Sequence, residues 1–223
     1  HELRTPLTTF HLYSDMLAEG MVQDGEKRQS YLETMRREAT RLNHLIENVL
    51  AYSRIERGSA RAQHEQISLG GLVERLEPRL HERARKDRAE LKVALDEEGA
   101  RSLVDTDLTA VEQIVFNLVD NACKYGLKDE GERVITLSVM NGGRTARIEV
   151  CDRGGGIARR DVKKLFRPFH KSACDAAHSK PGVGLGLALC RRLARALGGE
   201  VKLDAQRTEG ACFVLELPVV KER

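Results

Sequence analysis

The hydrophobic positions of the first 57 residues follow two helical patterns separated by a short polar break. Apolar side chains recur at roughly helical spacing through residues 1 to 23, and Asp24-Gly25 interrupts them. The second pattern is cleaner, because its apolar positions alternate by threes and fours as in a heptad repeat. Two amphipathic helices joined by a short turn predict an antiparallel hairpin. The second stripe consists of Leu32, Met35, Ala39, Leu42, Ile46 and Val49.

A hairpin of this size offers too little surface to bury both apolar stripes by itself. We therefore expect it to form a homodimer, in which two hairpins make a four-helix bundle. The second helix is predicted to end near Arg57-Gly58, and the small and polar residues 58–66 are interpreted as a linker.

From Ile67 onward, helical patterns are mixed with short strand patterns. Helices are predicted over 69–86, 107–125 and 184–197, the second of them capped by Asp105 or Asp107. Strands are predicted over 91–95, 134–139, 146–150, 200–204 and 211–217, and the glycines at 142–143 are typical of a hairpin turn. This mixture predicts an α/β sandwich whose mixed sheet is covered by helices on one face. The whole chain is therefore expected to be α+β, with a helical hairpin before the sandwich.

Composition narrows the classes of protein to consider. Lys plus Arg number 37 against 34 Asp plus Glu, so the formal charge of +3 gives no electrostatic case for nucleic acid as a partner. No stretch approaches the roughly 18 uninterrupted apolar residues of a membrane helix, so we expect no membrane contact by this part of the protein. The chain opens on His rather than Met, and we interpret it as a cytoplasmic piece of a longer protein whose membrane attachment stays open.

The cysteines do not follow the spacing of a bonded framework. They are odd in number, widely spaced and never form a Cys-x-x-Cys pair, which disfavours both disulfides and a zinc ribbon. We expect buried, small hydrophobic side chains in a reducing cytosol. The five are Cys123, Cys151, Cys174, Cys190 and Cys212.

The opening residues, His1-Glu2-Leu3-Arg4-Thr5-Pro6, carry the first candidate chemistry. On a helix, His1 and Thr5 share one face with Glu2 beside them. An imidazole acts as a nucleophile when a carboxylate accepts the proton of its other nitrogen. The zinc motif His-Glu-x-x-His is excluded, because position 5 is threonine. A solvated histidine with no function is the alternative.

A polar stripe in the helix over 107–125 is the second candidate. Asn117, Asn121 and Lys124 share one face, with apolar residues on another. An amide oxygen suits Mg²⁺, and an ammonium suits phosphate. The alternative is an ordinary polar surface.

Two glycine-rich segments follow. Asp152-Arg153-Gly154-Gly155-Gly156-Ile157 comes directly after a predicted strand, where glycines let backbone approach a flat ligand and the carboxylate accepts from an exocyclic amine. Gly182-Val183-Gly184-Leu185-Gly186-Leu187 leads into a helix whose N-terminus favours phosphate. Its Gly-x-Gly-x-Gly spacing fits neither a dinucleotide fingerprint nor a Walker loop. The polar residues 170–181, between the two segments, are typical of a mobile lid.

In order and spacing, these segments resemble the catalytic core of two-component sensor histidine kinases over nearly the whole chain. Residues 1–6 resemble the H box, 117–125 the N box, 152–156 the G1 box, 166–169 the F box and 182–186 the G2 box. The resemblance implies a dimerisation and phosphoacceptor hairpin at 1–57, a linker at 58–66 and a Bergerat-fold ATP-binding domain at 67–223.

The resemblance also implies a role for each motif residue. His1 would attack the γ-phosphate of ATP, Glu2 would serve as the base that orients its ring, and Thr5 would position the water that dephosphorylates a response regulator. Asn121, assisted by Asn117, would bind Mg²⁺. Further ATP contacts are implied for Lys124 and Tyr125 near the phosphates, Asp152 at the adenine amino group, Gly154, Gly156 and Ile157 around it, Lys171 toward the γ-phosphate, and Gly182, Gly184, Leu185 and Gly186 in the second glycine loop.

Two departures from the family pattern accompany these assignments. Gly155 stands where a proline is common, and Lys171 stands where the family often carries an arginine, which loses bidentate geometry but keeps the charge. The expected function is autophosphorylation on His1 and transfer to the receiver domain of a response regulator. The alternatives are a nucleotide-sensing scaffold and an ATP-hydrolysing relative. The latter carries Glu where this chain has Asn117, and an amide cannot act as that base.

Overall fold

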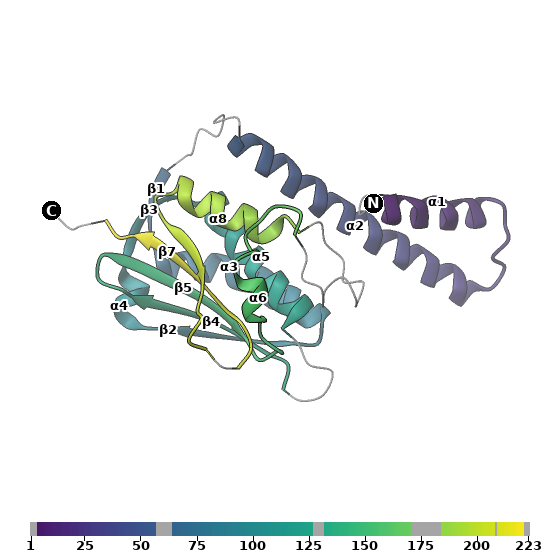
Figure 1. Cartoon of the computed structure of the whole chain (residues 1–223). Helices are drawn as coiled ribbons and strands as arrows, with labels where there is room; N and C mark the ends of the chain where they lie inside the picture. Colours follow the sequence, from purple (N-terminus) through teal and green to yellow (C-terminus); the bar gives the residue numbers. More distant parts are fainter. Residues whose placement is uncertain (1–3, 57–63, 127–131, 171–183, 208, 221–223) are drawn as a thin grey trace.

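A helical hairpin extends from one side of an α/β sandwich (Figure 1). The computed structural model describes residues 4–56, 64–126, 132–170, 184–207 and 209–220. Helices α1 (Arg4–Ala18) and α2 (Gly25–Glu56) run antiparallel, with the rings of Tyr13 and Tyr31 stacked 4.4 Å apart between them. The predicted hairpin and the α+β class are both confirmed.

The first helix ends at Ala18 rather than near residue 23. Gly20 takes a left-handed φ of 67°, and the Met21 N–H donates to the Met16 carbonyl at 3.1 Å. This left-handed glycine terminates the helix, because it turns the chain while satisfying an end carbonyl.

The sandwich is built on a five-stranded mixed sheet with the order β2-β4-β5-β7-β6. Only β2 and β4 pair in parallel, and the other neighbours are antiparallel. The predicted mixed sheet is therefore confirmed. Its strands are β2 (Glu90–Leu95), β4 (Val134–Asn141), β5 (Thr145–Asp152), β6 (Glu200–Leu203) and β7 (Cys212–Pro218).

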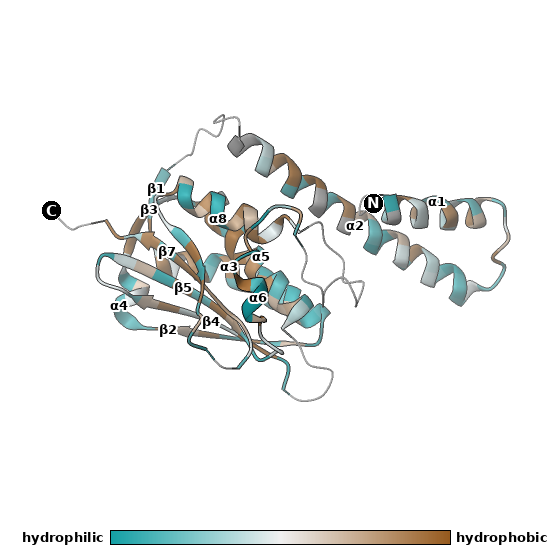
Figure 2. Ribbon diagram, in the orientation of Figure 1, coloured by the Kyte–Doolittle hydropathy of each residue, from teal (hydrophilic) through white to brown (hydrophobic). Residues whose placement is uncertain are grey.

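Helices α3 (Leu69–Lys86), α5 (Leu108–Tyr125) and α8 (Gly186–Ala196) cover one face of this sheet (Figure 1). Alternate strand residues such as Leu137, Ile148 and Leu215 are fully buried against them, and hydrophobic colour appears both on the strands and on the helices that cover them (Figure 2). Burying each such side chain contributes about 1.5–3 kcal/mol, so this face is the core. Two short helices, α4 (Glu97–Arg101) and α6 (Arg159–Val162), lie at the periphery.

A separate two-stranded sheet joins β1 (His64–Ser68) to β3 (Leu103–Asp107). Residues 64–66, interpreted from the sequence as the end of a linker, therefore belong to a strand. Its partner lies about forty positions away, with His64 opposite Asp107, and no local pattern reports such a pairing. Among the described residues, no helix combines the length and apolar character needed to cross a membrane.

Helix α5 begins at a well-defined cap. The Asp107 carboxylate accepts a hydrogen bond from the Ala110 N–H at 3.2 Å, which decides between the two caps considered. Asp105 instead pairs with Gln66 across β1 and β3. The cap fixes where α5 starts and thereby which of its side chains face α8.

Candidate functional site

The carboxylate of Asp152, at the end of β5, is held rigidly by backbone groups. Asp152 is only 5% exposed, and its Oδ1 accepts hydrogen bonds from the N–H groups of Gly154 at 2.9 Å and Ala211 at 3.0 Å. The Asp152 N–H donates in turn to the Ala211 carbonyl at 2.9 Å. The Gly154 and Ala211 N–H groups both donate to Oδ1 and fix the orientation of the carboxylate.

Three glycines from three segments pack against this aspartate. A Cβ added at Gly126 would lie 2.3 Å from the Asp152 side chain, and one at Gly210 would lie 1.9 Å from the Asp152 carbonyl oxygen. A Cβ at Gly154 would lie 2.7 Å from the Gly126 Cα. Only glycine permits such approaches. Sequence reasoning missed Gly126, Gly210 and Ala211; the position of Gly126 directly after the Asn-to-Tyr segment was the one available signal.

The remaining residues of the first glycine segment lie beside this aspartate. A Cβ at Gly156, whose φ is 70°, would lie 3.0 Å from the Gly210 carbonyl oxygen. Ile157 is partly buried and packs against the core. The segment is therefore anchored at both ends, while Gly155 between them meets no atom within 4 Å of an added Cβ.

Burial raises the pKa of the Asp152 carboxyl above its ordinary value. The hydrogen bonds from Ala211 and Gly154 and the charge of Arg207 oppose this effect without cancelling it. The carboxylate is consequently easier to protonate than that of an exposed aspartate.

The polar stripe of α5 faces α8. Asn121 is half-buried, and its Nδ2 lies 4.0 Å from where a Cβ at Gly186 would stand. Asn117, one turn earlier, is 5% exposed, and its Nδ2 has no hydrogen-bond partner among the described residues. The structure thus brings Asn121 to the first turn of α8.

Among the residues that the structure describes, no side chain caps the start of α8. Leu185, at the N-cap position, is buried and provides no side-chain hydrogen bond to the first turn. Gly184 takes a φ of 71°, and its carbonyl accepts the Phe169 N–H at 3.0 Å. Uncapped N–H groups at the positive end of the helix dipole favour an anion such as phosphate.

Lys124, in the last turn of α5, belongs to an ion-pair network with Asp120 and Arg83. Its ammonium lies 2.5 Å from Asp120 Oδ2, and the Arg83 guanidinium donates to Asp120 Oδ1 at 2.7 Å. Arg83 also donates to Asp87 at 2.8 Å. The lysine expected near phosphates is therefore shared with a buried carboxylate. Tyr125, the next residue, is half-buried at the end of α5.

Several of the expected site residues lie outside the described part of the chain. These are His1, Glu2, Lys171 and Gly182, together with the side chain of Thr5, whose backbone belongs to α1. The segment expected to act as a lid, 170–181, is described only at His170.

The hairpin docks on the sandwich close to α8. The Arg192 guanidinium lies 4.9 Å from the centre of the Tyr52 ring, and Gln113 donates to the Asn48 side chain at 3.4 Å. These contacts join α2 to the two helices that carry the polar stripe and the uncapped N-terminus.

The cysteine prediction needs a correction. Cys151 and Cys212, separated by 61 positions, form a disulfide between β5 and β7. The strand register places them opposite each other, which sequence spacing alone does not reveal. Cys123 and Cys190 are free and buried as expected, and burial raises their pKa to about 11 and about 12. Cys174 lies outside the described residues.

Comparisons with known proteins agree with this geometry. Residues 106–221 match the family model described as histidine kinase-, DNA gyrase B- and HSP90-like ATPase, and residues 1–58 match the His Kinase A phospho-acceptor domain. The chain is 28% identical to the sensor histidine kinase WalK of Bacillus subtilis (strain 168) over 229 residues. The match covers 100% of the chain and 36% of WalK, so the chain spans about a third of this relative.

Two solved structures share the arrangement. Full-length ShkA in complex with AMPPNP has a TM-score of 0.70 and 27% identity, covering 100% of this chain and 45% of ShkA. Histidine kinase ThkA in complex with the response regulator TrrA has a TM-score of 0.72 and 24% identity, covering 99% of this chain and 59% of ThkA. The chain belongs to the histidine kinase-, DNA gyrase B- and HSP90-like ATPase family, with an N-terminal phosphoacceptor hairpin and an ATP-binding domain like those of sensor histidine kinases.

Proposed function

We propose that this chain is the working core of a sensor histidine kinase: it binds ATP with Mg²⁺, phosphorylates His1 and passes the phosphoryl group to an aspartate of a response-regulator receiver domain. The observation that carries the proposal is the buried, backbone-held carboxylate of Asp152 in a chain that also matches a phosphoacceptor hairpin. Such a carboxylate is suited to accept a hydrogen bond from the adenine amino group. The AMPPNP complex of ShkA, at 27% identity, supports a nucleotide in this domain.

The groups at which α5 faces the first turn of α8 fit a Mg²⁺ ion bound to phosphate. The Asn121 amide lies beside the first turn of α8. Its oxygen would be the hard ligand for Mg²⁺, and the N-terminus of α8 would bind phosphate. Asn117, one helical turn before Asn121, would assist Asn121 in binding Mg²⁺. Gly184 and Gly186 would let the backbone approach the phosphates. Lys124 would add positive charge near them. Bound Mg²⁺ would neutralise phosphate charge. Lys171 would lie toward the γ-phosphate, and Gly182 would contact ATP as part of the second glycine loop.

The proposed reaction is a balanced phosphoryl transfer. A ring nitrogen of His1 forms a bond to the γ-phosphorus while the bond to the β-phosphate oxygen breaks, and ADP leaves. Glu2 accepts the proton from the other ring nitrogen. The carboxylate of the regulator's aspartate then bonds to the phosphorus while the P–N bond to His1 breaks, and the proton held by Glu2 returns to the ring to regenerate the neutral imidazole. In dephosphorylation of the regulator, Thr5 would orient a water.

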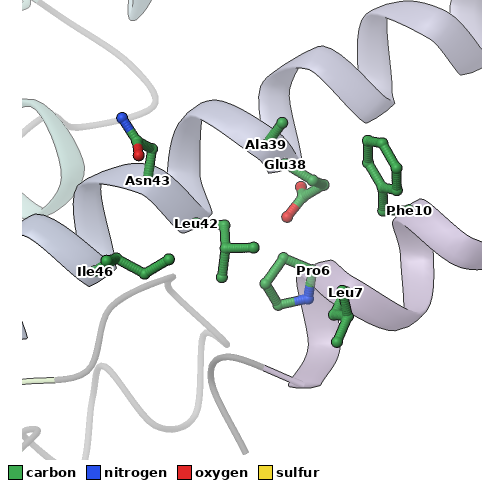
Figure 3. A pocket seen from close by; sticks show the side chains of 8 residues that line it. All are labelled: Pro6, Leu7, Phe10, Glu38, Ala39, Leu42, Asn43 and Ile46. Atoms are coloured by element: carbon green, nitrogen blue, oxygen red, sulfur yellow. The ribbon is translucent and has the colours of Figure 1, made fainter.

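The hairpin provides a face for a second copy of the chain. A groove between α1 and α2 is lined mainly by apolar side chains (Figure 3). Leu7 is 51% exposed and Ile46 is 43% exposed, although both belong to the apolar stripes. Burying these stripes against a second hairpin supports a homodimer, with the receiver docking on α1. The lining residues are Pro6, Leu7, Phe10, Glu38, Ala39, Leu42, Asn43 and Ile46.

ATP hydrolysis without phosphorylation of the chain is the rival function. It requires a base where this chain carries Asn117, and that amide is buried and neutral. Because ATP and a receiver domain would be the substrates, we expect this part of the protein to face the cytoplasm.

Labelling with γ-³²P-ATP and Mg²⁺ tests the function. Wild type is expected to gain label that is labile in acid and stable in alkali, and His1→Gln is expected to gain none. His11→Gln is the matched control, because His11 is an exposed histidine of the same hairpin. Label that survives in His1→Gln, or phosphate release with no labelled protein, would contradict the assignment.

The raised pKa of Asp152 predicts a pH dependence of nucleotide binding. An ionised carboxylate accepts the adenine amino hydrogen bond, so affinity is present above the pKa and is lost as pH falls through it. Because burial raises this pKa, the loss should begin at a higher pH than for an ordinary aspartate. Calorimetric titration of AMPPNP from neutral to acid pH measures it. Asp152→Asn carries an amide that does not titrate, so its affinity should lack the part of the pH dependence that comes from Asp152. Identical plots of affinity against pH for the two proteins would refute the prediction.

A further inference from the structure

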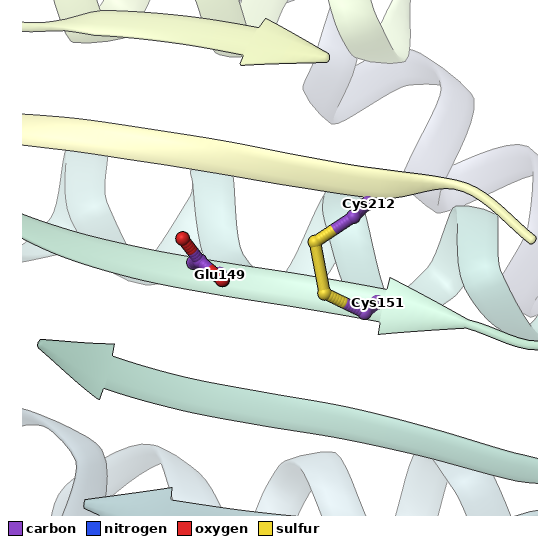
Figure 4. Close-up of side chains that lie close together, drawn as sticks. All are labelled: Glu149, Cys151 and Cys212. Atoms are coloured by element: carbon purple, nitrogen blue, oxygen red, sulfur yellow. A yellow bond between two sulfur atoms is a disulfide. The ribbon is translucent and has the colours of Figure 1, made fainter. Parts of the chain in front are cut away.

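Cys151 and Cys212 lie on the face of the sheet that points away from the helices. Their neighbours Val150 and Phe213 belong to the core, so the alternation of a strand turns both cysteines to the opposite face. Glu149, two residues before Cys151, shares that face (Figure 4). The disulfide is therefore separate from the hydrophobic core and ties only β5 to β7.

The disulfide sits directly beside the group that holds Asp152. Cys151 immediately precedes Asp152, and Cys212 immediately follows Ala211. Both hydrogen bonds between Asp152 and Ala211 thus lie one residue from the bonded sulfur atoms. A covalent link at this point restricts the two strand ends to the separation that those hydrogen bonds require.

The place of the pair in the sheet allows it to react. Both side chains are buried, at 4% and 1% exposure, but β5 ends at Asp152 and β7 begins at Cys212. Strand ends open locally more readily than strand centres, which admits a small oxidant or reductant. Cys123 and Cys190 instead lie within helices α5 and α8 and form no disulfide.

We propose that Cys151 and Cys212 are a thiol–disulfide modification site that sets nucleotide affinity. In the disulfide form, the strand ends are held together and the Asp152 carboxylate is preorganised for the adenine amino group. In the dithiol form, Ala211 moves more freely and the affinity falls. This inference rests on the proposed role of Asp152.

The oxidant is a peroxide or a small disulfide. With a peroxide, the two thiols lose two electrons and two protons, the S–S bond forms and the O–O bond breaks to give water and an alcohol or a second water. With a small disulfide, two exchange steps release two small thiols and leave the protein disulfide. A dithiol reductant reverses either reaction.

Wild type alone provides the main test, so no variant has to fold. Calorimetric titration with AMPPNP and Mg²⁺ compares peroxide-oxidised protein with dithiothreitol-reduced protein, after peptide mapping verifies the Cys151–Cys212 link. Reduced protein should bind about three- to tenfold more weakly, as expected when a preorganised site regains freedom. The double variant Cys151→Ser/Cys212→Ser should bind like reduced wild type under both conditions. Cys123→Ala/Cys190→Ala should keep the full redox response.

Other outcomes overturn the proposal. Equal affinity in both redox states would remove the link to the nucleotide, and a redox response that persists in the double serine variant would assign it elsewhere. The ligand atoms of Glu149, Cys151 and Cys212 lie within 4.8 Å of one another. Uptake of zinc by reduced protein that Glu149→Gln abolishes, with nucleotide affinity indifferent to redox state, would make the cluster a metal site instead. Absence of AMPPNP binding in both states would overturn the proposed function as well.

Discussion

Gly154→Ala is expected to weaken nucleotide binding strongly, whereas Gly155→Ala, one residue later, should leave it nearly unchanged. A Cβ at Gly154 would lie 2.7 Å from Gly126 Cα and 2.8 Å from the Gly126 carbonyl atoms, which are backbone and cannot rotate away. The loop must move outward, and the hydrogen bond from the Gly154 N–H to Asp152 is then lost. Such overpacking costs about 1–3 kcal/mol. If this cost destabilises the nucleotide-bound form relative to the free form, affinity falls about five- to 150-fold.

Gly155 is a matched control for this substitution. An added Cβ there meets no atom within 4 Å, and Gly155 is not among the residues with positive φ. Calorimetric titration of both variants with AMPPNP measures the difference, and circular dichroism verifies that each is folded. If the two alanine variants bind equally well, the close contact between Gly154 and Gly126 does not shape the nucleotide site.

Asp120→Ala is expected to lower the free energy of unfolding of the ATP-binding domain by about 3 kcal/mol. The substitution leaves the charges of Arg83 and Lys124 without their shared carboxylate in a largely buried place. Asp120 bonds to Arg83 and Lys124, and the Arg83 side chain is itself 16% exposed. Glu82→Ala is the matched control, since Glu82 pairs with Lys86 at the same i to i+4 spacing as Asp120 with Lys124. Both residues of the control pair are about two-thirds exposed, so little measurable change is expected there. Urea unfolding of the three proteins tests this.

The pH dependence of the same comparison has a definite sign. Burial alone would raise the pKa of Asp120, but the Lys124 ammonium and the Arg83 guanidinium outweigh it and hold that pKa below its ordinary value. The stabilisation is therefore complete above the pKa of a free aspartate and is lost as pH falls through the lowered value. The gap in stability between wild type and Asp120→Ala should close on acidification. A gap that stays constant would show that the ion pairs do not produce it.

The amino-acid sequence by itself determined the elements whose signal is local. Helix α3 spans the predicted 69–86, because its apolar side chains repeat on one face. The hairpin of β4 and β5 follows from alternation around Asn141-Gly142-Gly143, where the Asn141 side chain accepts the Gly143 N–H at 2.7 Å. The order of the five motifs also carried the resemblance that the family models support.

Only the tertiary structure decided which distant segments meet. Periodicity reports which face of an element is buried but not which neighbour covers it, so the partner of β1 and the Cys151–Cys212 link were not predictable. The same limit applies to Asp120, whose partner Arg83 lies 37 positions away and shares it with Lys124. Gly126, Gly210 and Ala211 hold Asp152 through backbone contacts that leave no pattern in the side chains. The sequence therefore determined which functional groups are available at the site, and the register of β5 against β7 decided how the Asp152 carboxylate is positioned.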